Sequence, residues 1–324
     1  MARDVEVFLG DHVLEHGDTL EADLVCGRLY GKAGAPVIVI PGGISASRFI
    51  ADEPETGPQV GSNWWPELVY EGGPIDLARF QILGLDLAPC GVNAQKTLTI
   101  TTNDQAKRLA ALLDHLEIAR VEAMIGTSYG GMVSLAFAQN YPDRLGRLCL
   151  LGATHKPFPM GVGLRGIQRR IVKFATEVGQ PEEGLKLARQ LAMSTYRSAA
   201  EFTTRFDGKP TQTGPFSFDV CDYLVACGSR YPESMPVQRF MALSESIDLH
   251  HVDPAKITTP TLLIATRSDQ LAPPSEIRIL CDALAGPADM VTIDSLYGHD
   301  SFLKESEVLG PLLSDFISEA RHAA

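Results

Sequence analysis

The sequence of 324 residues lacks the features that mark several large classes of protein. No apolar run approaches the roughly 18 residues of a membrane span, and residues 1–18 lack the apolar segment of a secretory signal peptide. Positive charge is scarce, because 28 lysines and arginines face 40 acidic residues, for a net charge of −12. This balance disfavours nonspecific binding to nucleic acid or anionic lipid. We therefore expect a soluble, globular, cytoplasmic protein with neither nucleic acid nor membrane as a partner.

The six cysteines show no C-x-x-C pair and no spacing typical of metal ligands. Several stand in apolar runs, such as Cys149 in "LCLLG". This usage is typical of buried thiols in a reducing compartment. We expect no metal site.

Strand and helix signals alternate over the first half of the chain. Helical spacing and glycine-bounded apolar runs predict helices at 102–118 and 130–141 and strands at 36–43, 80–87, 121–126 and 146–152. Thr102 and Gln105 fit a capping box at the start of the first helix. The alternation predicts an α/β fold with a mostly parallel sheet flanked by helices.

The pattern changes beyond residue 155. Helical, irregular sequence fills much of 160–250, and the basic run "GIQRRIVK" there is typical of a solvated helix face. Strand signals return at 259–269 and 289–295, and a helix is predicted at 306–320. The chain is therefore expected to form one α/β core from 1–155 and 251–324. A helical lid inserted at 156–250 would lie over the sheet.

The stretch "IGTSYGGM" (125–132) fits the pattern G-x-S-x-G with Gly126, Ser128 and Gly130. It falls between a predicted strand and a predicted helix, where a nucleophile elbow belongs. Glycines on both sides of the serine leave room in a turn so sharp that a Cβ would clash. Ser128 is thus the candidate nucleophile, and a glycine-rich turn with an incidental serine is the alternative.

A base and an acid for Ser128 are predicted from chain order. α/β-hydrolases place their catalytic groups in the order Ser, Asp or Glu, His. His299 follows the last predicted strand and precedes the final helix, which makes it the candidate base. Asp269 follows the strand "TLLIAT" in a loop with Ser268 and Gln270 and is the preferred acid, while Asp294 competes because it also ends a strand.

Two backbone N–H groups are needed to stabilise an oxyanion. Tyr129 would supply one at the start of the helix after Ser128. The loop "PGGISAS" (41–47) would supply the other, from Gly43 or Ile44.

Several motifs together resemble the homoserine O-acetyltransferase family of α/β-hydrolase-fold acyltransferases. "GTSYGGM" is similar to the family's G-x-S-x-G-G-M, "SDQLAPP" to S-D-x-L-F-P, and "GHDSFL" to G-H-D-x-F-L. The block "ARQLAMSTYRSAAEFTTRF" (188–206) resembles a family block within the helical insertion, and "SESIDLHHVD" (244–253) resembles a segment ending in L-D-L-H-D. The likeness covers most of the chain. The family's His-Ala-Leu-Thr-Gly loop is replaced by "PGGIS", and its Gly-Ser-Thr-Gly-Pro stretch is missing after "GLDLAPCGVN".

The resemblance implies a ping-pong acyltransferase of methionine biosynthesis, with Ser128, Asp269 and His299 as its triad. An acyl group would pass from acyl-CoA through Ser128 to L-homoserine. Acetyl-CoA is the family default, succinyl-CoA is an alternative donor, and serine is a possible acceptor. No bound cofactor is implied, and the resemblance also implies a homodimer.

The resemblance further implies that Arg189, Tyr196 and Asp300 hold the amino-acid substrate. A guanidinium can clamp a carboxylate through two hydrogen bonds, and a carboxylate can accept from an ammonium. The charges of Arg189 and Asp300 therefore argue against the rival interpretation, a simple esterase or hydrolase with the same triad.

Overall fold

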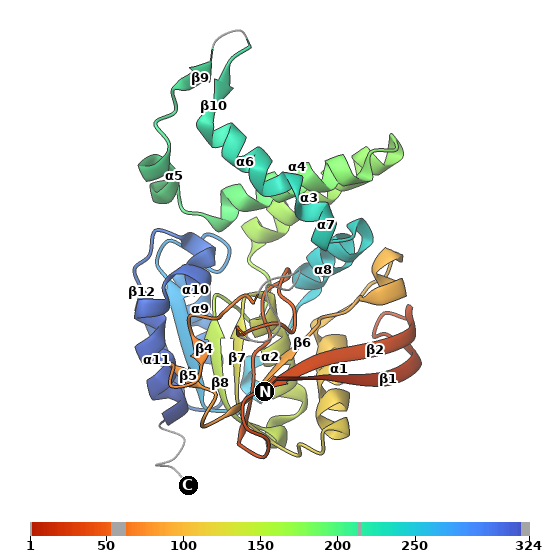
Figure 1. Cartoon of the computed structure of the whole chain (residues 1–324), viewed down its shortest axis with the longest axis vertical. Helices are drawn as coiled ribbons and strands as arrows, with labels where there is room; N and C mark the ends of the chain where they lie inside the picture. The colour runs from red at the N-terminus through yellow and green to blue at the C-terminus, as the bar shows by residue number, and fades with distance from the viewer. Residues whose placement is uncertain (1, 53–62, 213–214, 319–324) are drawn as a thin grey trace.

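A computed structural model describes residues 2–52, 63–212 and 215–318. Within them, eight strands form one sheet in the order β1-β2-β6-β3-β7-β8-β11-β12 (Figure 1). The strands are β1 (Arg3–Val13), β2 (Thr19–Tyr30), β3 (Val37–Val39), β6 (Gln81–Leu85), β7 (Val121–Thr127), β8 (Leu145–Leu151), β11 (Thr261–Thr266) and β12 (Ala288–Ile293). From β6 to β12 every neighbouring pair is parallel, whereas β1, β2 and β6 pair antiparallel. The predicted α/β class with a mostly parallel sheet is confirmed.

Helices cover both faces of the sheet because successive strand residues point to opposite sides. In β3, Val37 and Val39 pack into a cluster with residues of α1, α2 and α9. Ile38 belongs to a second cluster with residues of α11. The helices of this body are α1 (Thr102–His115), α2 (Tyr129–Asn140), α9 (Pro274–Ala283), α10 (Ser301–Lys304) and α11 (Ser306–Ser318). The last two residues of the helix predicted at 306–320 lie outside the described residues.

Short elements connect these strands and helices. They are β4 (Val69–Tyr70), β5 (Ile75–Asp76) and the 3-10 turns η1 (Gly91–Gln95), η2 (Pro142–Arg144), η3 (Pro254–Lys256) and η4 (Gly298–Asp300). The turn η4 carries the candidate base, and it leads directly into α10.

The capping box predicted for α1 is wrong by one residue. Thr101 is the N-cap; its side chain accepts from the backbone N–H of Asp104, and the Asp104 carboxylate accepts from the N–H of Thr101. Gln105 instead turns inward, where its side chain accepts from Ala88 N–H and donates to Ala88 O. The capping pair therefore secures the helix start, and Gln105 is free to fix the loop before it.

The sequence analysis missed the two N-terminal strands. β1 and β2 form a long antiparallel pair at one edge of the sheet (Figure 1). Their signal is present in part, since Val5, Val7 and Leu9 alternate with Asp4, Glu6 and the exposed Phe8, as expected for a strand with one buried face.

A group of helices lies above one end of the sheet, at the top of Figure 1. We call residues 159–249 the helical cap. Its elements are α3 (Pro159–Glu177), α4 (Pro181–Tyr196), α5 (Ala199–Arg205), β9 (Pro210–Gln212), β10 (Ser217–Phe218), α6 (Asp219–Ser229), α7 (Tyr231–Ser234) and α8 (Val237–Leu249). The hairpin of β9 and β10 projects farthest from the body (Figure 1). The predicted division into core and lid at residues 155 and 250 stays a prediction.

The structure bears on two further expectations, the burial of the cysteines and the lack of a membrane-spanning helix. All six cysteines are free thiols, but only Cys149 and Cys281 are buried, and Cys221 is exposed. The expectation of buried thiols therefore holds for two of the six. Among the described helices, none has the length and apolar character to cross a bilayer.

Candidate active site

Ser128 lies in a sharp turn between β7 and α2. Its backbone has φ of 50° and ψ of −120°, and positive φ is unusual for a residue with a side chain. The turn is secured because Ser128 N–H donates to Leu151 O at 2.9 Å, and Gly131 N–H donates back to Ser128 O at 2.9 Å. The strain is therefore stabilised by β8 and by the first turn of α2.

Two glycines of the motif make this turn possible. A Cβ on Gly126 would lie 2.5 Å from Ser134 Oγ, and one on Gly130 would lie 2.1 Å from Pro41 O. Both contacts are too short for any other residue type. Gly130 thereby also lets the start of α2 approach the 41–47 loop closely.

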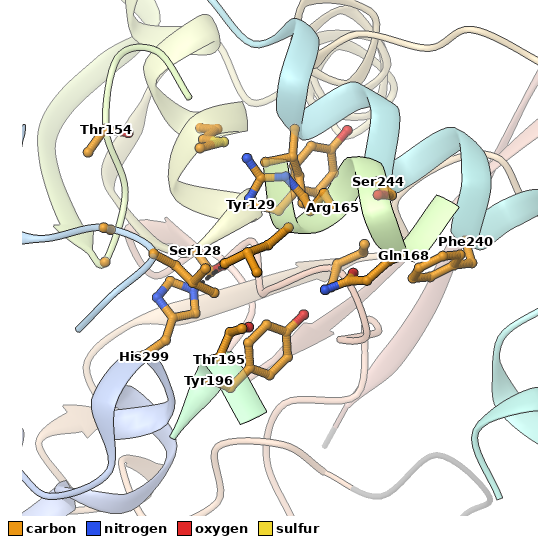
Figure 2. A pocket seen from close by; sticks show the side chains of 17 residues that line it. Ser128, Tyr129, Thr154, Arg165, Gln168, Thr195, Tyr196, Phe240, Ser244 and His299 are labelled. Atoms are coloured by element: carbon orange, nitrogen blue, oxygen red, sulfur yellow. Dashed lines mark hydrogen bonds between the residues drawn. The ribbon is translucent and has the colours of Figure 1, made fainter. Parts of the chain in front are cut away.

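The structure brings Ser128, His299 and Asp269 together at the carboxyl ends of three parallel strands, β7, β12 and β11. Ser128 Oγ is 2.7 Å from His299 Nε2, and His299 Nδ1 is 2.7 Å from Asp269 Oδ2 (Figure 2 shows the first contact). Asp269 is further held because its Oδ1 accepts from Leu271 N–H at 2.8 Å and Ala272 N–H at 3.0 Å. This is the arrangement of a serine nucleophile with its base and orienting acid.

The pKa values of the pair shift in opposite directions. Burial alone raises the pKa of Asp269, but the charge and hydrogen bond of His299, with the two backbone N–H donors, bring it below its usual value. Burial alone lowers the pKa of His299, but the charge and hydrogen bond of Asp269 raise it above its usual value. The imidazolium that forms during proton transfer is therefore stabilised by an ionised acid.

The competing acid, Asp294, lies elsewhere. Its Oδ1 is 2.5 Å from Arg267 Nε, and both side chains are exposed.

Sequence analysis overlooked Gly152, which follows β8. A Cβ there would lie 3.3 Å from His299 Cε1 and 3.4 Å from Asp269 Oδ2. Its φ of +61° after a buried strand is a signal that only the structure reveals.

The predicted oxyanion groups border Ser128. Tyr129 is the first residue of α2, where backbone N–H groups have no acceptor within the helix. The Cβ position of Gly43 is 3.7 Å from Ser128 Cβ, and Ile44 lines the same cavity as Ser128. The Tyr129 side chain points away into the interior, where its hydroxyl is 2.7 Å from Ser246 Oγ of α8. Burial raises the pKa of that phenol to about 12, so it stays protonated.

A cavity of about 50 Å³ opens at Ser128 and His299 beneath the cap. Arg165 and Gln168 of α3 and Tyr196 of α4 line it (Figure 2). On this measure one water needs roughly 10–15 Å³, so the cavity has room for only a few water molecules.

Arg165 was not singled out by sequence analysis. Its Nε donates to Asp248 Oδ1 at 2.6 Å, and Arg169 Nη2 is 2.6 Å from the other oxygen of that carboxylate. Among the described residues, no group accepts from Nη1 or Nη2 of Arg165. The ion pair thus fixes a guanidinium on a side chain that lines the cavity, and its two outer nitrogens have no acceptor among the described residues. Arg169, in the run expected to be a solvated face, is partly buried instead.

The three predicted substrate residues gather on the cap side of His299. The Tyr196 ring lies 5.9 Å from the His299 ring, and the Arg189 guanidinium lies 5.3 Å from the Tyr196 ring and 4.6 Å from the Tyr231 ring. No carboxylate pairs with Arg189 in the described part of the chain. Asp300 is buried beside His299. Of the three, only Tyr196 lines the cavity at Ser128.

The whole chain can be compared with known proteins. A family model described as the alpha/beta hydrolase fold matches residues 35–306. A homoserine O-succinyltransferase from Xanthomonas campestris is 38% identical over 89% of this chain and 77% of its own length. The chain belongs to the homoserine O-acyltransferase family of the α/β-hydrolase fold.

Solved structures agree on the fold. A homoserine O-acetyltransferase from Bacillus anthracis has a TM-score of 0.90 at 18% identity over 98% of both chains. An esterase named E22 has a TM-score of 0.88, also at 18% identity, over 98% of this chain and 100% of its own. Because homoserine acyltransferases and an esterase share this architecture equally, the cavity's side chains must distinguish the two activities. No cluster of three or more metal-ligating side chains occurs among the described residues.

Proposed function

We propose that this chain transfers an acyl group from acyl-CoA to the hydroxyl of L-homoserine, a step of methionine biosynthesis, through an acyl-Ser128 intermediate. The observation that carries the proposal is the continuous chain of short contacts from Ser128 through His299 to Asp269. It lies at a cavity lined by the fixed guanidinium of Arg165.

The reaction has two half-reactions. In the first, His299 takes the proton of Ser128 Oγ while that oxygen attacks the thioester carbonyl, and the tetrahedral oxyanion accepts from Tyr129 N–H and from Gly43 or Ile44 N–H. The C–S bond then breaks, and His299 returns the proton to the departing CoA thiolate. In the second, His299 deprotonates the homoserine hydroxyl, which attacks the acyl-Ser128 ester, and Ser128 leaves with that proton. Asp269 holds the His299 ring and stabilises its cation throughout.

Arg189 and Asp300 are proposed to hold the acceptor by its two charges. Arg189 lacks a carboxylate partner within the described residues, and its guanidinium is oriented by the rings of Tyr196 and Tyr231. The homoserine carboxylate would pair with this guanidinium through two charge-assisted hydrogen bonds. Tyr196 lies between this guanidinium and His299, so the acceptor would pack along its ring.

For the donor, we propose succinyl-CoA over acetyl-CoA. Arg165 and Gln168 line the same cavity as Ser128, and no described group accepts from Nη1 or Nη2 of Arg165. The distal carboxylate of a succinyl group would pair with Arg165, whereas an acetyl group has no such partner. The 38% identical relative is named as a succinyltransferase, which points the same way.

Mass spectrometry tests the proposal directly. The enzyme is offered acetyl-CoA or succinyl-CoA, each with homoserine, with serine or alone. We expect a succinyl adduct on Ser128 without acceptor and O-succinyl-homoserine with it. A CoA release rate that no amino acid accelerates would identify an esterase instead. Efficient transfer to serine would identify a serine O-acyltransferase.

The outer side of the cap supports a homodimer. Exposed apolar side chains gather along α3 and α4 around a shallow groove: Ile167, Phe174, Val178 and Leu187. Phe174 is 69% exposed. Exposed apolar side chains gathered in this way are typical of interfaces, and a second copy would cover them. Sedimentation equilibrium should give a dimer, and Phe174→Glu should give a monomer.

A further inference from the structure

The segment Arg197–Ser198, directly after α4, contacts the loops that carry both the acid and the base. Gln270, next to Asp269, donates from Nε2 to Arg197 O at 3.2 Å. Ser198 Oγ donates to Leu296 O in the loop before His299. The end of α4 therefore rests on both catalytic loops.

The base loop is shaped to receive this segment. Gly298 precedes His299 and has φ of +58°. A Cβ on Gly298 would lie 2.6 Å from Tyr196 O and 3.1 Å from Ser198 N. Glycine is thus required on two grounds, and the backbone of the cap lies against the backbone of the base loop.

The Arg197 side chain makes the charge contact between this segment and the base loop. Its Nε lies 3.3 Å from Asp300 Oδ2, and its Nη1 lies 3.6 Å from Glu201 Oε2. These are ion-pair distances without hydrogen-bond geometry. Arg205 lies 3.0 Å from the other oxygen of Glu201. Arg197 and Glu201 are largely buried, while Arg205 is exposed at its outer end. One guanidinium therefore sits between two carboxylates, one of them on the residue after the catalytic base.

We propose that Arg197 is a positioning residue for the acceptor: it fixes the Asp300 carboxylate through Oδ2 and leaves Oδ1 for the substrate ammonium. This inference rests on the proposed function, because it takes Asp300 as the group that receives the ammonium. A buried carboxylate without this partner would rotate and lose its alignment beside His299. Arg197 acts only through Asp300, so the acylation of Ser128 does not require it.

The variants Arg197→Met and Arg197→Lys test the proposal against Arg205→Met. Methionine keeps much of the length and apolar character but removes the charge. Lysine keeps the charge, but a single nitrogen cannot serve two carboxylates as the planar guanidinium does. Arg205→Met is a matched control, since it removes a cation from the same Glu201 without touching Asp300.

For Arg197→Met we expect the homoserine KM to rise about tenfold or more, with an unchanged burst of CoA when acyl-CoA is given alone. Arg197→Lys should restore part of the loss, and Arg205→Met should match the wild type. The Lys variant carries the test if the Met variant does not fold.

Four results would overturn the proposal. An unchanged homoserine KM in Arg197→Met would show that Arg197 has no role in acceptor binding. A lower KM would show that Arg197 competes with the substrate ammonium for Asp300. Loss of the CoA burst in a folded variant would show a general structural role. Equal effects of Arg197→Met and Arg205→Met would place the function in Glu201. Failure of the proposed function itself is distinguishable, because the wild-type enzyme would then transfer nothing to homoserine.

Discussion

The α/β body and the helical cap hold their functional side chains by different means. In the body, backbone geometry does so: Ser128 at positive φ, Gly126 and Gly130 where no Cβ fits, and Asp269 accepting from two N–H groups. In the cap, charge pairs and rings do so, as with Arg165 on Asp248.

The body and the cap should therefore respond differently to substitutions. Backbone constraints hold one geometry, so substitutions in the body should remove chemistry for every substrate. Charge pairs between side chains can be exchanged singly, so substitutions in the cap should change which substrate is accepted. The predictions below test that division, from the largest expected effect to the smallest.

Ser128→Ala should abolish both half-reactions, because the oxygen that carries the acyl group is gone. We expect a loss of several orders of magnitude, down to the roughly 10³-fold over water that binding and the oxyanion donors supply. Intact-protein mass spectrometry should find no acyl adduct, and circular dichroism should find a normal fold. Activity close to that of the wild type would disprove the covalent mechanism.

Asp269→Asn should lower kcat by roughly 10⁴-fold, since the amide favours the wrong tautomer of His299. Asp294→Asn is the matched control: its carboxylate pairs with Arg267 at the surface, so kcat should change little. Equal losses in both variants would contradict the assignment of the acid.

The pH profile sharpens the same comparison. His299 must be unprotonated to act as a base, and Asp269 raises its pKa. Wild-type kcat/KM should therefore fall as the pH drops through a value above the usual 6.5 or so for histidine. In Asp269→Asn, this acid limb should move to lower pH, because the stabilising charge is gone. A limb that stays in place would mean that another group controls it.

The catalytic residues of the body could be predicted from the sequence, because the backbone constraints that hold them require particular residue types at fixed positions. An elbow needs glycines at fixed offsets from Ser128, and chain order then restricts the base and acid to loops after later strands. These constraints are local, so they are visible in the residues. The edge strand β1 was overlooked even though Val5 and Val7 carry its alternating pattern.

The cap was harder to predict because its contacts join distant segments. Arg165 meets Asp248 83 positions later in the chain, and Arg197 meets Asp300 across the junction with the base loop. Nothing near Arg165 in the sequence distinguishes a cavity-lining arginine from a surface one. Only the family block drew attention to Arg189, and the structure adds the tyrosine rings around it.

Arg189→Leu separates the two half-reactions. If Arg189 holds only the homoserine carboxylate, acyl-CoA alone should still acylate Ser128 and release one burst of CoA. Transfer should fall by roughly 10²-fold or more in kcat/KM for homoserine, because a charge-assisted bidentate contact is lost. Rapid-quench assays of CoA and product measure both steps. A folded variant that cannot be acylated would show that Arg189 serves the donor or the oxyanion.

Arg165→Met tests the opposite side of the cavity, and Arg169→Met is its control. Both arginines pair with Asp248, but only Arg165 lines the cavity at Ser128. If Arg165 receives the distal carboxylate of the donor, Arg165→Met should lower kcat/KM for succinyl-CoA by about 10- to 100-fold, the value of a hydrogen bond to a charged group.

Comparing succinyl-CoA with acetyl-CoA shows whether Arg165 recognises the donor or only supports the fold. With acetyl-CoA, which has no second carboxylate, Arg165→Met should retain most of its activity, so the ratio of the two donors shifts. Arg169→Met removes the same kind of charge from Asp248 outside the cavity, so it should affect both donors equally. Equal losses for both donors in Arg165→Met would mean that the guanidinium only supports α3 against α8. The difference between body and cap would then not extend to the choice of acyl donor.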